Sequence, residues 1–255
     1  MKRKEQIAYG WHAVRELLSS SLFVKEVWVA RSKREAERGE IRKWCKQREI
    51  AQVEKSSAEL SKLCQTDKHQ GIAALFLPCS QKIFFLDSQR QPNYNYWLCL
   101  YLDHIQDPHN FGAIVRSSSF FGADQLFYPS HRAAPWNQTA LKSSAGSGIF
   151  HQPYALSSPS SFFQKARAEN FMLVGTTLEG GIPLSDFSWT HNLLLILGNE
   201  ERGICPSLKK LCTHLITLSP QGAISSLNVS SAAAVFLYHL TYGKKRHSVI
   251  DGLEY

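Results

Sequence analysis

Several features typical of common protein classes are absent from this chain of 255 residues. No apolar run reaches the roughly 18 residues that a membrane span needs. The charged stretch Met1–Gln6 is not followed by an apolar core, so it does not resemble a signal peptide. Hydrophobic residues make up 44% and charged residues 20%, an ordinary balance for a folded protein. We therefore expect a folded protein without membrane spans, located in the cytoplasm.

Cysteine and histidine occur without the spacing of a metal site. The six cysteines are widely scattered and form no C-x-x-C pair. The ten histidines also fail to cluster at ligand spacing. This pattern argues against structural zinc and against a redox pair, and it suits reduced thiols in a cytosol. The sequence predicts no bound metal.

Three common catalytic signatures are also missing. No candidate strand is followed by G-x-G-x-x-G, and the chain has no P-loop lysine pattern. A G-x-S-x-G elbow is absent as well. A classical dinucleotide site, a nucleoside triphosphatase and the commonest hydrolase are therefore disfavoured.

The net charge of +8 is concentrated in the first third of the chain. Residues 1–78 carry 16 Lys/Arg against 10 Asp/Glu, whereas residues 79–255 carry 13 against 11. A basic part joined to a nearly neutral part favours one domain that holds a polyanion. The candidates for phosphate contacts are Arg31, Lys33, Arg34, Arg38, Arg42 and Lys43. A plain solvated basic helix is the alternative.

Hydrophobic patterning divides the chain into two folded parts. Residues 1–78 alternate short helices and strands and predict a small α/β domain. Residues 79–96 lose periodicity and gather Gln, Asn, Pro and Ser, as an interdomain linker does. In residues 97–243 strands alternate with helices, which predicts a mostly parallel sheet with helices on both faces. Residues 244–255 are interpreted as a frayed tail.

The most informative segment is Asp103–Arg116. It follows an apolar strand candidate, and Asp107-Pro108 predicts a turn into a helix for which Asn110 is a suitable N-cap. Arg116 lies less than two turns from Asn110, so both can approach one edge. In open α/β sheets, ligands usually bind where strands feed helices. A capped helix with a surface arginine is the alternative interpretation.

Two later segments end strands in the same way. The apolar run beginning at Leu193 ends in Gly198-Asn199-Glu200, where a glycine would let a ligand approach the backbone. The run beginning at Leu215 leads into a loop and a last helix, which we expect Ser225 or Ser226 to cap, with Asn228 in its first turn. Each segment alone is more typical of a capped loop. Together, three polar loops at strand ends favour a site.

These three segments resemble the sequence motifs of the SpoU family of RNA ribose 2′-O-methyltransferases, in the SPOUT superfamily. The first motif is similar to Asp107–Gly112 with Arg116, the second to Leu197–Gly203 and the third to Ser226–Ser230. Tyr9–Leu18 and His69–Gly71 resemble, more loosely, the substrate-binding domain of members that modify a 23S rRNA guanosine, the RlmB type. Ser117–Ser119 and Ser219–Gln221 depart mildly from the family's usual residues.

The resemblance implies a cofactor, a topology and an assembly. The cofactor is S-adenosylmethionine, the topology includes a deep trefoil knot, and the assembly is a homodimer in which Arg116 completes the partner's site. The residues that fall at cofactor positions are Gly198, Leu218 and Leu227. Those at catalytic positions are Asn110, Arg116, Glu200, Ser226 and Asn228.

The expected activity is methylation of a ribose 2′-hydroxyl in RNA, with a guanosine of 23S rRNA as the first target. A tRNA ribose methyltransferase is the alternative within the same class. A non-catalytic RNA-binding factor for ribosome assembly is the alternative outside it, although such a binder has no need of Asn110, Arg116, Glu200 and Asn228 together.

Overall fold

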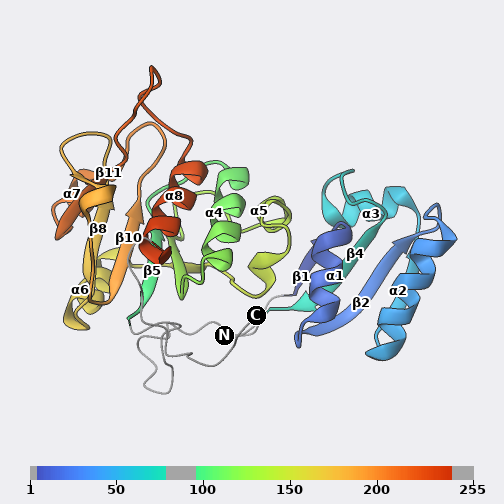
Figure 1. Cartoon of the computed structure of the whole chain (residues 1–255). Helices are drawn as coiled ribbons and strands as arrows, with labels where there is room; N and C mark the ends of the chain where they lie inside the picture. Colours follow the sequence, from blue (N-terminus) through green and yellow to red (C-terminus); the bar gives the residue numbers. More distant parts are fainter. Residues whose placement is uncertain (1–4, 79–95, 243–255) are drawn as a thin grey trace.

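The computed structural model describes residues 5–78 and 96–242, which form two separate β-sheets (Figure 1). The predicted linker 79–96, except for its last residue, and the predicted tail 244–255 lie outside the described residues. The two sheets coincide with the two folded parts expected from the sequence. The domain limits themselves stay a prediction.

The first sheet has four strands in the order β1-β4-β2-β3, with β2 and β3 parallel and the other pairs antiparallel. Its elements are β1 Gln6–Tyr9, α1 Trp11–Ser19, β2 Phe23–Ala30, α2 Glu35–Gln47, β3 Ala51–Lys55, α3 Ser57–Cys64 and β4 Ile72–Leu77. The α/β prediction for this part is confirmed. β1 was missed because its four residues are too short for a visible period.

A turn before β4 ties this small sheet together. Gln70 and Gly71 both have positive φ, and the Gln70 side-chain oxygen accepts a 2.8 Å hydrogen bond from the Trp11 backbone N–H. This bond satisfies a donor that the first turn of α1 would otherwise leave free. The buried ring of His69 accepts from the Gly71 N–H at 3.0 Å. The His69–Gly71 segment therefore has a structural role in this fold.

The second sheet has seven strands, and every pairing in it is parallel. The strand order is β7-β6-β5-β10-β8-β11-β9. Its strands are β5 Leu98–Leu102, β6 Gln125–Pro129, β7 Tyr154–Leu156, β8 Met172–Thr176, β9 Ile182–Pro183, β10 Leu193–Leu197 and β11 His214–Thr217. The helical elements are α4 Pro108–Phe120, α5 Gln138–Ser143, η2 Ser147–Ile149, α6 Pro159–Ala168, η3 Leu184–Asp186, α7 Pro206–Lys209 and α8 Val229–Tyr242.

Helices cover both faces of this sheet, as the sequence predicts. β5 and β10 are buried at every position, which a strand packed on both faces requires. Alternate residues of β5 point to opposite sides: Leu100 joins the apolar core under α4 and α8, whereas Tyr101 joins the core under α6 and α7. α4 and α8 lie side by side (Figure 1).

The two sheets are joined by contacts between α5 and the first part of the chain. Leu141 and Ile149 belong to the same apolar cluster as the core of the small sheet. The Lys142 ammonium donates to the Lys68 carbonyl oxygen at 2.5 Å and lies 5.3 Å from the centre of the Tyr9 ring. An apolar contact and a cationic contact therefore hold the described parts together beyond the chain connection.

Two predicted helix starts were wrong. α4 begins at Pro108 with Asp107 as N-cap, whose carboxylate accepts from the His109 N–H at 2.9 Å. A proline at the first helical position favours this start, which leaves Asn110 inside the first turn. α8 begins at Val229, so neither Ser225 nor Ser226 caps it. The trefoil knot stays a prediction.

Candidate active site

Three predicted polar residues meet at the carboxyl edge of the large sheet. β5 and β10 pair in register at Leu102 and Leu197, so the loops that follow them emerge side by side. The Asn110 amide nitrogen donates to Glu200 Oε1 at 2.9 Å, and the Asn228 amide nitrogen donates to Asn110 Oδ1 at 3.0 Å. The structure therefore joins residues that are 90 and 118 positions apart in the chain.

The Asn228 side chain also begins the last helix. Its Oδ1 accepts from the backbone N–H of Ser230 at 2.8 Å and from the Ser230 hydroxyl at 2.6 Å. With its oxygen committed to the helix, the amide must present its nitrogen to Asn110. Helix capping thus fixes which end of the amide faces the site.

Glu200 is held by a tight turn after β10. Asn199 and Gly203 exchange two backbone hydrogen bonds of 3.0 and 2.9 Å. The Asn199 Oδ1 accepts from the N–H groups of Glu201 and Arg202, and its Nδ2 donates to the His104 carbonyl at 3.0 Å. The turn is thereby anchored to the loop after β5. Asn199 was recognised in the second motif but not as a positioning residue.

The need for glycine at position 198 has a different origin from the one that the sequence suggested. A Cβ at Gly198 would lie 2.3 Å from the carbonyl carbon of Gly203 and 2.4 Å from the nitrogen of Ile204. The turn after β10 closes directly over this position. The close approach is therefore made by the chain's own backbone, which leaves no room for a ligand against the α-carbon.

The buried carboxylate of Asp103 lies next to this network, and the sequence analysis did not identify it as a site residue. Asp103 ends β5 with 2% of its surface exposed. Its Oδ2 accepts from the Cys205 backbone N–H at 2.7 Å, and its Oδ1 lies 2.6 Å from His104 Nδ1. An acidic residue directly after an apolar strand is the signal that could have identified it. Asp103 ties the loop after β5 to the loop after β10.

The other predicted catalytic residues stand apart from this network. Arg116 is exposed on α4, beside a hollow lined by Ser117, Phe120 and Ser144. In the described part of the chain, no hydrogen bond or ion pair joins Arg116 to Asn110, Glu200 or Asn228. Six residues along a helix correspond to about 9 Å of rise. Ser226 lies in the exposed loop between β11 and α8.

The predicted cofactor residues lie in loops that follow two strands of the large sheet: Gly198 comes directly after β10, and Leu218 and Leu227 lie between β11 and α8. Leu218 follows β11, and Leu227 lies in the loop that projects above the sheet in Figure 1. This region exposes three large apolar side chains: Leu178 by 70%, Ile224 by 79% and Leu227 by 58%. Exposed apolar side chains beside backbone amides suit a ligand with an apolar ring system and polar edges.

The six basic residues proposed for RNA contacts differ in their availability. Lys33 donates to the Gln70 carbonyl at 3.0 Å and pairs with Glu37 at 3.2 Å, so its charge is used within the fold. Arg38 pairs with Glu35 and Glu54. Arg42 pairs with Glu35 at 3.4 Å while staying largely exposed. The exposed side chains of the set that carry no ion pair within the described residues are Arg31, Arg34 and Lys43.

With this geometry established, sequence comparison decides the family. Residues 97–238 match the SpoU rRNA Methylase family, and residues 7–80 match the RNA 2′-O ribose methyltransferase substrate-binding family. The chain belongs to the SpoU rRNA Methylase family. It is therefore an RNA methyltransferase of the SpoU/TrmH class, and the resemblance read from the three motifs is confirmed.

Individual relatives agree with this assignment. A Staphylococcus haemolyticus protein assigned to the TrmH family of tRNA/rRNA methyltransferases is 27% identical, covering 96% of this chain and 98% of that protein. Among solved structures, the SpoU methyltransferase AviRb from Streptomyces viridochromogenes, in complex with AdoMet, superposes with a TM-score of 0.73. It is 23% identical, with 92% of this chain and 88% of that chain covered. An RNA 2′-O ribose methyltransferase structure superposes with a TM-score of 0.75 at 21% identity, covering 92% and 87%.

None of the helices in residues 5–78 and 96–242 is both long and apolar enough to cross a membrane. The same residues contain no group of three His, Cys, Asp or Glu side chains that could hold a metal ion.

Proposed function

We propose that this SpoU-family protein transfers a methyl group from S-adenosylmethionine to a ribose 2′-hydroxyl of RNA in the cytoplasm, with a guanosine of 23S rRNA as its target. The observation that carries this proposal is the hydrogen-bonded chain Glu200–Asn110–Asn228 at the carboxyl edge of the parallel sheet. Such an edge is the usual place for a ligand in this architecture. The match of residues 7–80 to an RNA substrate-binding family supports RNA as the substrate.

The residues present fit the cofactor. The exposed Leu227 and the half-buried Leu218 would hold its apolar parts, and the exposed backbone of the turn that follows Gly198 would meet its polar edges. S-adenosylmethionine supplies a methyl group that is already activated as a sulfonium. The protein therefore needs chiefly to align the ribose and to help the 2′-hydroxyl lose its proton.

Asn110 and Glu200 orient the nucleotide, and Asn228 fixes the Asn110 amide. Ser226 orders the loop or holds the ribose. A guanidinium with a pKa above about 12 is a poor base. Arg116 therefore anchors the target phosphate and lowers the pKa of the hydroxyl, and the proton passes to phosphate, to water or to a transiently neutral arginine.

A homodimer would bring Arg116 to the site. In one chain no hydrogen bond or ion pair of the described residues joins Arg116 to the network of Asn110, and the hollow beside Arg116 is lined by serines together with Phe120 and Phe121. Phe120 at the end of α4 is 77% exposed, and Tyr242 at the end of α8 is 65% exposed. The Phe121 ring contacts those of Phe120 and Tyr242, and Tyr238 contacts Tyr242. An aromatic face of this kind suits a self-complementary interface, in which each chain would offer its arginine to the other.

The first experiment is methyl transfer. The purified protein is incubated with labelled S-adenosylmethionine and total RNA from cells that lack it, and the label is mapped. Label on a 23S ribose 2′-oxygen supports class and target together. Label on tRNA keeps the class and overturns the target. Failure to bind S-adenosylmethionine contradicts the enzyme proposal and favours a non-catalytic RNA-binding factor.

Complementation tests the arginine and the dimer. Arg116→Ala and Asn110→Ala should each abolish transfer while S-adenosylmethionine binding persists, whereas Arg167→Ala on α6 should behave as wild type. Co-expression of the two inactive variants should restore about a quarter of the activity, because half of randomly paired dimers are mixed and each mixed dimer has one intact site. No recovery contradicts a shared site. Near-full activity of Arg116→Lys contradicts a bidentate anchor.

A further inference from the structure

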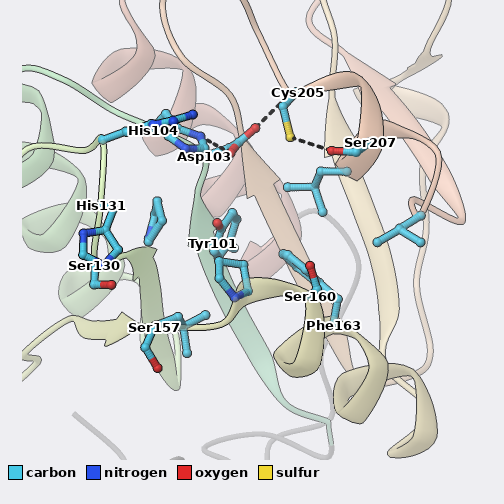
Figure 2. Close-up of a pocket in the computed structure, with 16 residues that line it drawn as sticks. Tyr101, Asp103, His104, Ser130, His131, Ser157, Ser160, Phe163, Cys205 and Ser207 are labelled. Carbon is cyan, nitrogen blue, oxygen red and sulfur yellow. Dashed lines mark hydrogen bonds and ion pairs between the residues drawn. The ribbon is translucent and has the colours of Figure 1, made fainter.

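A cavity of about 270 Å³ opens at the same edge of the sheet as the Asn110 network, but on the side of α6 and α7 (Figure 2). It lies at the carboxyl ends of β5, β6 and β7, away from the β11–α8 loop that carries Leu218 and Leu227. Asp103 and His104 form one of its walls. The His104 carbonyl is bonded to Asn199, so the cavity and the Glu200 turn share this backbone.

The inside of the cavity is apolar. Its floor consists of the rings and aliphatic groups of Tyr101, Leu156, Phe163 and Leu208, all of them buried. Burial, with a smaller contribution from the Asp103 carboxylate, raises the pKa of the Tyr101 phenol, which therefore stays a neutral hydroxyl. The floor suits a flat, uncharged ring system better than an ion.

The rim of the cavity is polar and carries one arginine. The hydroxyl-bearing residues Ser157, Ser160 and Ser207 surround the opening, and His131 and Arg132 are exposed beside it. Figure 2 shows His131 and Ser207 on opposite sides of the opening. Hydroxyl groups can pair with the edge of a base, and a guanidinium can pair with a phosphate.

The loop that carries His131 and Arg132 is held in place. The Gln106 amide donates to the Arg132 carbonyl at 2.9 Å, and the Ala134 N–H donates to the Ile105 carbonyl at 2.7 Å. These bonds connect the loop after β6 to the loop after β5. The backbone that carries Arg132 is therefore held next to the loop that follows Asp103.

Size limits the occupant. Pockets for drug-sized ligands span about 300–1,000 Å³, so this cavity suits one ring system and excludes a stacked run of nucleotides. A free phosphate would not use the apolar floor. An apolar slot with hydroxyl groups at its rim and an arginine outside matches the way in which proteins hold unstacked RNA bases.

We propose that this cavity receives one unstacked nucleobase of the RNA substrate, next to the ribose that is methylated, while Arg132 contacts the adjoining phosphate. This inference rests on the proposed RNA methyltransferase function and adds a base-reading subsite to it. The base selected here would contribute to the choice of target, which the ribose contacts alone do not provide.

The test fills the cavity without touching the Asn110 network. Ser160→Trp places an indole at the opening, and Ser161→Trp, on the next residue of α6 and also exposed, is the matched control. In vitro transcribed 23S rRNA is the probe for both filter binding and methyl transfer. Ser160→Trp should lower kcat/KM for RNA by about 5- to 150-fold relative to Ser161→Trp, the range expected from stacking of one base. Far-UV circular dichroism and S-adenosylmethionine binding should be the same in both variants.

Base removal identifies the occupant. Synthetic RNAs spanning the mapped ribose carry one abasic nucleotide at each position in turn. At one position, loss of the base should lower kcat/KM of the wild-type enzyme by the same factor as the Ser160→Trp substitution does. In the Ser160→Trp variant, the same base loss should lower kcat/KM no further. Equal kinetics of the two tryptophan variants overturn the inference, as does equal sensitivity of wild type and Ser160→Trp to every abasic substitution.

The two proposals fail in distinguishable ways. If wild type transfers no methyl group but Ser160→Trp alone weakens binding of the transcript, the proposed function is contradicted and the base subsite is supported. If wild type methylates and both tryptophan variants match it, the subsite is contradicted and the function stands.

Discussion

Replacement of Gly198 by alanine tests whether the turn after β10, which carries Glu200, closes directly over this glycine. The added Cβ would lie 2.3 Å from Gly203 C, 2.4 Å from Ile204 N and 2.7 Å from Gly203 O. All three are backbone atoms, so no side-chain rotation can relieve the contact. Forcing an extra methyl group into a packed site typically costs about 1–3 kcal/mol, and rigid neighbours place this case at the upper end.

The Gly198→Ala substitution should lower both the stability of the protein and its affinity for S-adenosylmethionine. A loss of about 3 kcal/mol corresponds to a melting temperature lower by about 6–12 °C in a protein of this size. The turn at Asn199–Gly203 must open to accommodate the methyl group, so Glu200 should leave Asn110 and S-adenosylmethionine binding should weaken. Thermal denaturation followed by circular dichroism, with calorimetric titration of the cofactor, measures both effects.

The exposed Gly222 provides the control, because a Cβ there meets no atom within 4 Å. Gly222→Ala should melt within about 1 °C of wild type, as surface substitutions usually do. A Gly198→Ala protein that melts together with Gly222→Ala and binds cofactor normally would refute the steric argument and the proposed closure of the turn.

Three further outcomes follow from features of the described residues. Gly39→Ala, inside α2 with nothing near its Cβ, should stabilise the protein by about 0.5–1 kcal/mol, and an unchanged urea midpoint would contradict this. Arg48 donates three hydrogen bonds of 2.7–3.1 Å to carbonyls at and after the end of α1, so Arg48→Met should cost about 2–3 kcal/mol, whereas Arg31→Met should be neutral. Burial lowers the pKa of His151 from 6.5 to about 4, so the unfolded state binds the proton more tightly. Stability should therefore fall by about 3 kcal/mol as pH drops from about 6.5 to 4, and His151→Phe should flatten that part of the pH profile in urea titrations.

Local rules account for most of the elements that the sequence predicted correctly. β5 and β10 were identified because uninterrupted apolar runs of five residues mark strands that are buried on both faces. The structure shows the same local control at the start of α3, where Ser56 and Glu59 form a capping box whose two hydrogen bonds lie within four residues. The short strands β7 and β9 escaped prediction, because their pairing depends on neighbours distant in sequence.

The candidate site likewise has features that are local in sequence and features that depend on distant residues. The sequence by itself determined that Asn110, Glu200 and Asn228 follow strands of one parallel sheet, because the hydrophobic period and the turn residues are local properties. It did not determine that Asn228 caps α8, that Gly198 is required by the chain's own turn, or that Asp103 joins two loops. Those depend on atoms that are remote in sequence and that meet only when the strands align in register. Only the tertiary structure, moreover, separated Arg116 from the network and opened the cavity between α6 and α7, because exposure and empty volume are properties of packing that no local pattern contains.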